Sequence, residues 1–189
     1  MLTEEWLPKP APLDHEEALA EIVSRYFRSH GPATVKDFAW WSGLRVADAR
    51  LGLEKVSSRL SEGVVGGTSC YAPRDATGRA TTQRSAYLLP AFDEYLVGYA
   101  DRSATLRSRD AGERIRNADV VVHSNGIFLP TLVVNGTVAG VWKRTRAKVG
   151  LVITLSPFRK LNASQMAEVR EQVESYGNFF ETEAALATR

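Results

Sequence analysis

The stretch from residue 120 to residue 158 constrains the fold most, because its apolar residues recur with a period of two and many are β-branched. That pattern is typical of half-buried strands. The dipeptides Asn125-Gly126 and Asn135-Gly136 are strong signals for tight two-residue turns. We therefore expect an antiparallel β meander with strands at Val120–His123, Ile127–Val134, Thr137–Arg144 and Lys148–Leu155.

A helix is expected to follow the meander and to pack across the sheet. Ser164 is suited to cap its start, and apolar residues recur at every third or fourth position after it. These apolar positions are Met166, Val169, Val173, Tyr176 and Phe180. Residues 86–189 are thus predicted to form one α+β domain.

The expected turn at Thr145–Ala147 carries the densest cluster of basic residues in the chain. The cluster lies beside Trp142 and consists of Lys143, Arg144, Arg146 and Lys148. Cations next to an aromatic ring are the combination with which proteins follow a phosphate backbone and stack bases. Lysine and arginine at a hairpin tip also protect a sheet edge and raise solubility, so both interpretations stay open.

Before the meander, the sequence predicts three helices followed by a β-hairpin. Asp14 is suited to cap the first helix and Thr34 the second, and the third is expected from Val46 to Leu60. Two short β segments around Gly66-Gly67 would form the hairpin. This order is typical of a winged-helix module, which we place at 14–73, after an extended proline-rich leader at 1–13.

Basic residues lie on or near the outer side of the predicted third helix. In a winged-helix module this helix enters the major groove, and the hairpin reaches the neighbouring backbone. The candidate DNA contacts in this region are Lys36, Arg45, Arg50, Lys55 and Arg59. Two alternatives stay open, namely an ordinary solvated helix face and a winged helix that binds protein.

At the centre of the chain, in Tyr87–Arg102, two carboxylates fall within an apolar stretch. Pro90 ends the short apolar run before them, as expected where a strand ends. Asp93 and Glu94 then lie among aromatic and aliphatic residues, where a charge is costly unless it is paired or solvated. We note both as catalytic candidates, alongside the alternative of a structural turn with a local ion pair to Arg102.

Two polar segments without periodicity, 73–85 and 102–119, are predicted to form a linker and a solvated loop. Both are rich in arginine. In the first segment, Arg74, Arg79 and Arg84 are able to touch a polyanion.

Composition excludes several kinds of site. The single Cys70 cannot form an internal disulfide or a cysteine-based metal site, and His15, His30 and His123 lack metal-binding spacing. We therefore expect no metal and no cofactor. No apolar run approaches the roughly 20 residues of a membrane span, and no secretory signal begins the sequence, so we expect a cytoplasmic protein. The net charge of +2 is compatible with a nucleic-acid partner.

Four segments, found in one order, resemble a single bacterial protein family. They are HGPATVKDFAWWSGL at 30–44, LLPAFDEYLVGYADR at 88–102, the stretch 124–136, and VAGVWKRTRAKVG at 138–150. Together they resemble the "winged helix DNA-binding domain-containing" family. Its characterised members are DNA glycosylases that excise bulky alkylated bases and unhook interstrand crosslinks, including those that protect producers of azinomycin. The resemblance extends from about Trp6 to Phe180.

This resemblance implies DNA binding, with catalysis placed outside the chain. Members of the family are about twice as long, and the resemblance covers their C-terminal half. Their catalytic motif, which is glutamine, any residue, and then glutamine or aspartate, lies in the other half. None of Gln83, Gln165 and Gln172 stands two residues before a glutamine or an aspartate.

We therefore expect a protein that binds double-stranded DNA and does not excise bases on its own. Its expected partners are duplex DNA and a missing N-terminal half of the same protein, with no membrane and no metal. The alternatives are a DNA glycosylase that removes alkylated bases and a winged helix that binds another protein.

Overall fold

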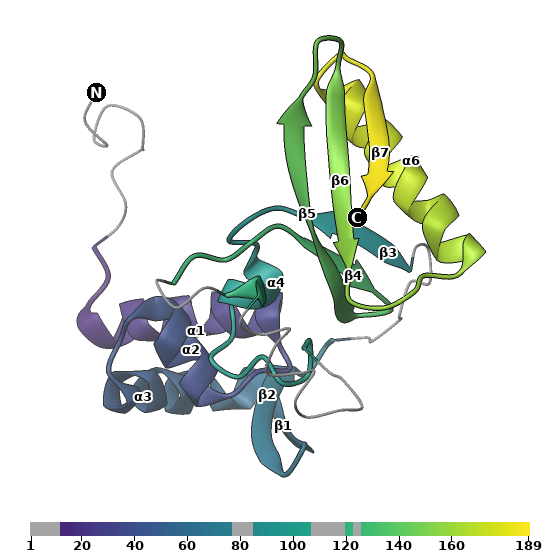
Figure 1. Cartoon of the computed structure of the whole chain (residues 1–189). Coiled ribbons are helices and arrows are strands. Elements are labelled where there is room, and N and C mark those ends of the chain that lie inside the picture. Colours follow the sequence, from purple (N-terminus) through teal and green to yellow (C-terminus); the bar gives the residue numbers. More distant parts are fainter. Residues whose placement is uncertain (1–11, 77–84, 107–119, 123–125) are drawn as a thin grey trace. The chain divides into compact units, whose positions relative to one another are not determined.

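The structure of the chain, a computed structural model, describes residues 12–76, 85–106, 120–122 and 126–189. Its backbone divides into two compact units, whose elements are labelled in Figure 1. Unit 1 comprises Met1–Gly78 and Gly98–Ala100, and unit 2 comprises Arg79–Val97 and Asp101–Arg189. Helices and strands occur in both units, which confirms the predicted α+β class.

Several sequence-based predictions fall outside the described residues. They concern the leader as far as residue 11, Arg79 and Arg84 of the linker, the loop at 107–119, and Asn125 of the first expected turn. Gln83 and His123 also lie outside the described ranges.

Unit 1 begins with three helices whose first two starts are fixed by side chains. In α1 (His15–His30), Asp14 accepts a hydrogen bond from the Glu17 backbone, and the Glu17 side chain accepts one from the Asp14 backbone. The same reciprocal arrangement links Thr34 and Asp37 at the start of α2 (Val35–Ser42). Each of these reciprocal pairs is a capping box, which satisfies backbone donors that have no partner inside the helix. The third helix, α3, spans Val46–Val56.

A two-stranded antiparallel hairpin follows the third helix. The helix ends earlier than predicted, because a short 3-10 turn, η2 (Ser57–Arg59), leads directly into β1 (Leu60–Val65). The connection to β2 (Thr68–Pro73) is made by Gly66 and Gly67, which both have positive φ, as a tight two-residue turn requires. Residues 14–73 thus contain the predicted order of three helices and a hairpin.

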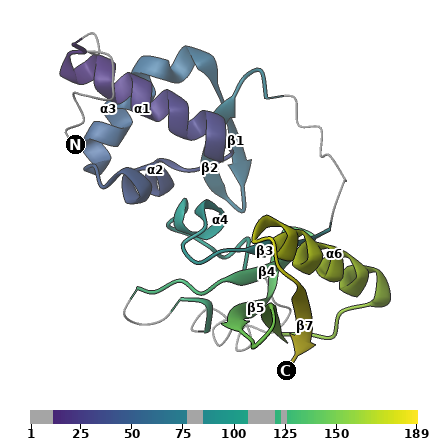
Figure 2. The same ribbon diagram turned by 90° about the horizontal axis from the view of Figure 1, so that it is seen from above.

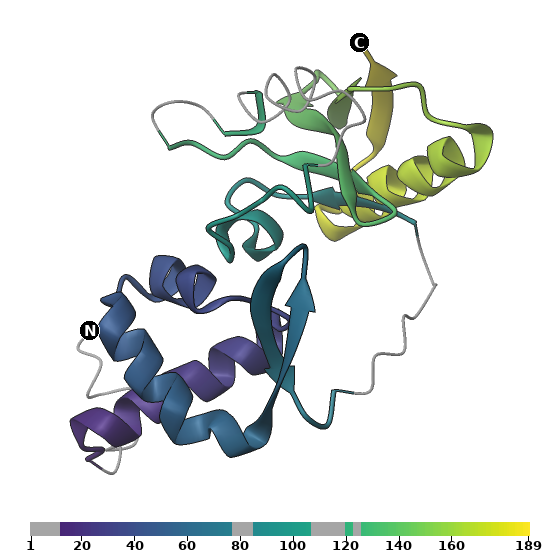
Figure 3. The ribbon, with the colours of Figure 1, turned by 90° about the horizontal axis from the view of Figure 1, so that it is seen from below.

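The core of unit 1 forms where α3 crosses α1 (Figure 3). Val23, Tyr26, Phe27 and Phe38 are fully buried in it. At Gly52 a Cβ atom would lie 2.7 Å from Val23 Cγ2, so the absence of a side chain is what lets the two helices approach so closely.

The segment Gly98–Ala100, although distant in sequence, belongs to unit 1 and is fastened there by three hydrogen bonds. Tyr26 Oη donates to the Gly98 carbonyl at 2.8 Å, and Tyr99 Oη donates to the His30 carbonyl at 2.8 Å. The Ala100 backbone donates to the buried carboxylate of Asp37 at 2.9 Å. These bonds fix Gly98–Ala100 to α1 and to the start of α2 within unit 1.

Unit 2 is built on one five-stranded sheet in the order β3-β4-β5-β6-β7. Neighbouring strands are antiparallel, except that β7 runs parallel to β6. The strands are β3 (Ala86–Leu89), β4 (Thr131–Val134), β5 (Thr137–Arg146), β6 (Leu151–Pro157) and β7 (Ala184–Thr188). A one-turn helix, α4 (Glu94–Val97), follows β3.

The predicted meander is correct at β4–β5–β6 and wrong at its beginning. Asn135 and Gly136 have positive φ and form the expected tight turn between β4 and β5. The strand predicted at Val120–His123 is wrong, because Val120 and Val121 are helical and Val122 forms only an isolated bridge. The next strand starts at Thr131 instead of Ile127, since Pro130 has no N–H to donate to a ladder.

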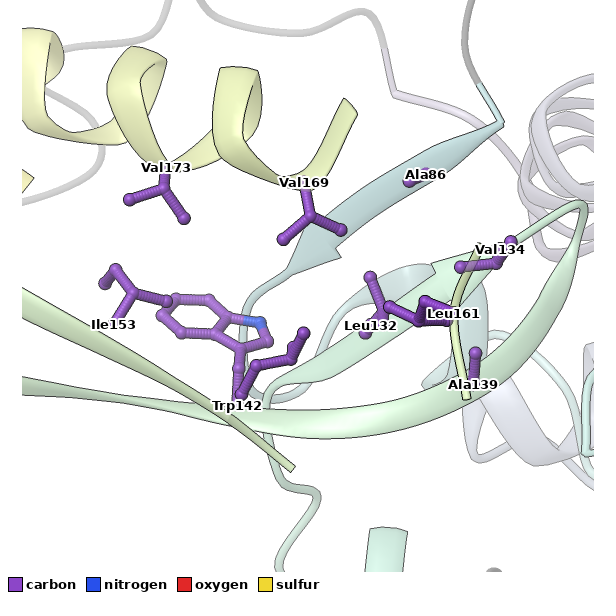
Figure 4. Packing of buried hydrophobic residues seen from close by; sticks show 10 residues of the cluster. Ala86, Leu132, Val134, Ala139, Trp142, Ile153, Leu161, Val169 and Val173 are labelled. Atoms are coloured by element: carbon purple, nitrogen blue, oxygen red, sulfur yellow. The ribbon is translucent and has the colours of Figure 1, made fainter. Parts of the chain in front are cut away.

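The last helix, α6 (Ala163–Phe179), lies along one face of the sheet (Figure 2). Its N-cap is Asn162, which forms a reciprocal box with Gln165, and not Ser164 as predicted. Figure 4 shows Val169 and Val173 directed from α6 towards Trp142 and Ile153 of the sheet. All four side chains are buried, so the prediction that this helix packs across the sheet is confirmed.

The carboxylate of Glu168 ties α6 to the start of β3. Its oxygens accept hydrogen bonds from the backbones of Ser85 and Ala86 at 2.6 and 2.9 Å, and from Ser85 Oγ at 2.8 Å. β7, which the sequence did not predict, completes the sheet by pairing with β6 over five residues.

Candidate functional site

The basic cluster predicted in the meander lies at the turn between β5 and β6. β5 continues as far as Arg146, so the turn falls at residues 147–150 and not at Thr145–Ala147 as predicted. It is closed by a hydrogen bond from the Ala147 backbone to the Gly150 carbonyl. All four predicted cations are exposed: Lys143, Arg144, Arg146 and Lys148.

Strand alternation divides the three cations of β5 between the two faces of the hairpin. Successive residues of a strand point to opposite faces, so Arg144 and Arg146 share the face of Trp142 while Lys143 is on the other. Arg144 confirms this direction, because its Nη1 donates to Tyr176 Oη of α6 at 3.0 Å. The predicted cluster is therefore not a single patch.

An open cavity of about 720 Å³ lies on the face that Arg144 and Arg146 share. Its lining consists of Arg144, Arg146, Ala147, Lys148, Gly150, Leu151, Phe180 and Thr182. Three of these residues are cationic and none is acidic. Within the described residues, none of the hairpin cations has a carboxylate at salt-bridge distance. The cavity therefore presents uncompensated positive charge to solvent.

Trp142 does not provide the exposed stacking surface that the sequence predicted. Its side chain is only 7% exposed and packs in the core between the sheet and α6. The indole Nε1 donates to the Leu89 carbonyl at 2.9 Å, and its ring meets Tyr176 edge to face. The prediction of an exposed Trp142 is wrong, because this residue lies on the face of β5 that α6 covers.

Two aromatic rings in contact with each other are exposed, one of them, Phe180, in the cavity lining, and the sequence did not predict either of them as a surface residue. Phe179 ends α6 and is 81% exposed, and Phe180, predicted to be part of the buried face, is its C-cap and is 44% exposed. The guanidinium carbon of Arg144 lies 5.3 Å from the centre of the Phe180 ring, which is within cation–π range. Residues adjacent on a helix are about 100° apart, so two consecutive phenylalanines at its end could not both face the core.

The cations predicted in unit 1 are exposed, but two of them are paired with acids of the same unit. Arg45, the N-cap of α3, contacts Asp48 at 3.0 Å, and Lys55 forms a salt bridge with Glu16 of α1. These contacts raise the pKa of the Arg45 and Lys55 side chains. Three exposed cations have no carboxylate at salt-bridge distance in the described ranges: Lys36 of α2, Arg50 of α3 and Arg59 of η2.

Unit 1 also has a hollow, of about 350 Å³, beside Arg50. Unlike the cavity at the hairpin, it is lined by both signs of charge, since Arg50 and Arg74 are joined there by Glu54 and Glu62. Tyr71 contributes to its wall, and burial raises the pKa of this phenol. A polyanion would meet both attraction and repulsion at this hollow.

The central carboxylates lie at the start of α4. Asp93 Oδ1 accepts from the Tyr95 backbone at 2.9 Å, and the Asp93 carbonyl accepts from Leu96 and Val97, so Asp93 begins α4. Glu94 is the exposed first residue of that helix. Arg102, the expected partner, donates from Nε to the Leu96 carbonyl at 2.8 Å.

The described part of the chain offers neither a metal site nor a reactive thiol. It contains no cluster of three or more histidine, cysteine, aspartate or glutamate side chains suited to hold a metal ion. Cys70 is buried, and desolvation raises the pKa of its thiol, which disfavours the reactive thiolate. No helix in these ranges has the length and apolar character to span a bilayer.

Comparison with known proteins gives two matches. The profile of the family described as "DNA glycosylase AlkZ-like" matches residues 1–179. Among solved structures, the chain is similar to the DNA glycosylase AlkZ of Streptomyces sahachiroi, with a TM-score of 0.72 and 23% sequence identity, a level at which the likeness concerns the fold. The alignment covers 99% of this chain and 48% of that one, so the chain spans about half the length of the solved relative. No curated protein matches it.

Proposed function

Because the chain belongs to the AlkZ-like DNA glycosylase family, we propose that it binds double-stranded DNA in the repair of alkylated or crosslinked bases and does not excise a base by itself. The observation that carries the proposal is the cavity beside the β5–β6 turn, with three cations and no acid in its lining. Phosphate contacts of this kind supply most of the affinity of proteins for DNA, independently of sequence.

Unit 1 supplies a second set of contacts under this proposal. Its three helices and hairpin follow the order of a winged-helix module, in which α3 would enter the major groove. Arg50 of α3 and Arg59 of η2 are exposed, and neither has a carboxylate at salt-bridge distance in the described ranges. Arg45 and Lys55 are less suited, since a phosphate would have to displace Asp48 or Glu16.

The absence of base excision is proposed from the glutamines and from the central carboxylates. Gln165 is buried and caps α6, and neither it nor Gln172 begins the motif that the family resemblance implies. Excision needs a polar group that places water against the sugar as the base departs. Asp93 is a poor candidate, because its carboxylate and its carbonyl are used to start α4.

Binding is tested by fluorescence anisotropy with a labelled duplex, titrated at low and at moderate salt. The proposal expects affinity that falls steeply as salt rises, with a slope of about −0.9 for each phosphate contacted. Undetectable binding, or binding that does not respond to salt, would contradict it.

Catalysis is tested separately on alkylated and on crosslinked duplexes. After incubation with the chain, heating in alkali reveals any abasic site as a strand break. We expect no breaks above the level without protein. If breaks appear, the non-catalytic part of the proposal is wrong, and the variants Asp93→Asn and Glu94→Gln then show whether either carboxylate is responsible.

A further inference from the structure

A row of aromatic rings runs from the core of unit 2 to the exposed end of α6. Trp142 contacts Tyr176 with ring centres 5.6 Å apart, Tyr176 contacts Phe180 at 5.0 Å, and Phe180 contacts Phe179 at 5.1 Å. Exposure rises along the row from 7% at Trp142 to 81% at Phe179. The inner rings hold the outer ones in place, so the exposed pair is supported by the core.

The exposed pair, Phe179 and Phe180, adjoins the cationic cavity. Phe180 is part of the cavity lining, together with Arg146 and Lys148. Arg144 is held beside Phe180 by the cation–π contact and by its hydrogen bond to Tyr176. Acidic residues near this end of α6, namely Glu174, Glu181 and Glu183, line an adjoining hollow that shares Thr182 with the cavity. One aromatic ring, that of Phe180, and three cations thus meet in the cavity lining, which contains no carboxylate.

Contiguous exposed apolar groups, such as the adjacent rings of Phe179 and Phe180, mark a candidate binding site. A purely apolar partner would bury Arg144, Arg146 and Lys148 without compensation, which is costly. A ligand with a planar apolar face and negative charge a short distance away satisfies both features. Within DNA, only a nucleotide whose base is out of the helical stack presents both.

We propose that this cavity and the adjacent ring of Phe179 bind an unpaired nucleotide of DNA, with its base stacked on Phe179 and meeting Phe180 edge to face, and its phosphates at Arg146 and Lys148. The proposal rests on the proposed function for its ligand class. It adds that the chain binds unpaired nucleotides as well as the backbone of duplex DNA. Phosphate contacts alone would bind any strand. Stacking requires an accessible base.

The test compares a short oligothymidylate with a strand of the same length whose sugars carry no bases. Both strands have the same phosphates, so the ratio of their affinities isolates stacking. In the full chain the base-bearing strand should bind about tenfold more tightly, as expected for one or two stacked bases. Equal affinity for the two strands would overturn the proposal.

Variants of Phe179 locate the effect without disturbing the core, because this side chain is almost fully exposed. Phe179→Leu keeps an apolar group and removes the ring, and it should bring the affinity ratio down to within about threefold of unity. Phe179→Trp should keep the ratio. Phe92, another exposed phenylalanine of unit 2, gives the matched control Phe92→Leu, which should also keep the ratio. If Phe179→Leu leaves the ratio unchanged, stacking at this site is excluded.

Duplex binding in the same titrations separates this proposal from the broader one. Salt-dependent duplex binding together with equal affinity for the two single strands would contradict only the unpaired-nucleotide site. A base-dependent preference among single strands without duplex binding would support the site and contradict the proposed duplex function.

Discussion

The exposed cations of unit 1 and those of the β5–β6 hairpin in unit 2 have different surroundings. In unit 1, Asp48 is three residues from Arg45 on the same helix, and α1 offers Glu16 to Lys55. In the hairpin, the strands and the end of α6 place aromatic rings next to the cations and no acid at salt-bridge distance within the described residues. Helix surfaces readily bring opposite charges together, so a basic helix face is weak evidence for a polyanion partner.

The largest effect is expected from removing the hairpin cations together. At about 0.1 M salt, deleting a cation that binds a phosphate should weaken duplex binding nearly tenfold, because the release of its counterion no longer contributes. Replacing Lys143, Arg144, Arg146 and Lys148 by alanine should therefore weaken binding by several thousandfold, about 0.9 log units for each cation. The variant of unit 1 with Lys36, Arg50 and Arg59 replaced by alanine should lose less affinity for each cation removed. An equal or larger effect in unit 1 would reverse the comparison.

A second comparison concerns the two carboxylates that tie distant segments together. Asp37 holds Ala100 in unit 1, and Glu168 holds Ser85 and Ala86 in unit 2. Replacing either by alanine leaves backbone donors without a partner, which should lower the free energy of unfolding by about 2 kcal/mol or more. Urea denaturation measures this decrease. Stability within error of the original chain would show that these donors find other partners.

A smaller effect is expected at Tyr95, whose hydroxyl donates to the Gly136 carbonyl at 2.7 Å. Burial raises the pKa of this phenol, so its stabilising contribution is fully present below its unfolded pKa of 10 and is lost as pH rises through the folded value. Tyr95→Phe should lower the free energy of unfolding by about 1 kcal/mol near neutral pH. Above pH 10 the difference should shrink, and a difference that grows with pH would contradict this assignment.

The smallest effect is expected when the paired cations of unit 1 are removed. Arg45→Ala and Lys55→Ala each delete one exposed ion pair, and such pairs contribute little to stability. Duplex affinity should also change by less than about threefold, since these side chains already have partners. A decrease as large as that caused by Arg146→Ala, measured in the same anisotropy assay, would show that DNA displaces Asp48 and Glu16.

Local sequence rules predicted much of the fold. Asp14 and Thr34 cap their helices, and Gly66-Gly67 and Asn135-Gly136 form the expected tight turns, because each of these features is decided by a few neighbouring residues. β7 was not predicted, since AALAT has no turn signal before it and becomes a strand only by pairing with β6. Its parallel direction depends on the path of α6, which no local pattern contains.

The candidate site was predicted in part. The cations of the hairpin were found because four of them occur within six residues. Their division between two faces follows from strand alternation once β5 is known to extend to Arg146. Trp142 was predicted to be exposed and is buried, whereas Phe180 was predicted to be buried and is exposed. Both outcomes depend on where α6 ends. That point is set by tertiary packing more than by helical periodicity.

The most direct test of the central claim is the salt dependence of duplex binding by the chain and by its variant with all four hairpin cations replaced by alanine. If Lys143, Arg144, Arg146 and Lys148 contact phosphates, the slope of log affinity against log salt should become less negative by about 3 to 4. A slope that is the same in both proteins would contradict the claim that the hairpin of unit 2 contacts DNA.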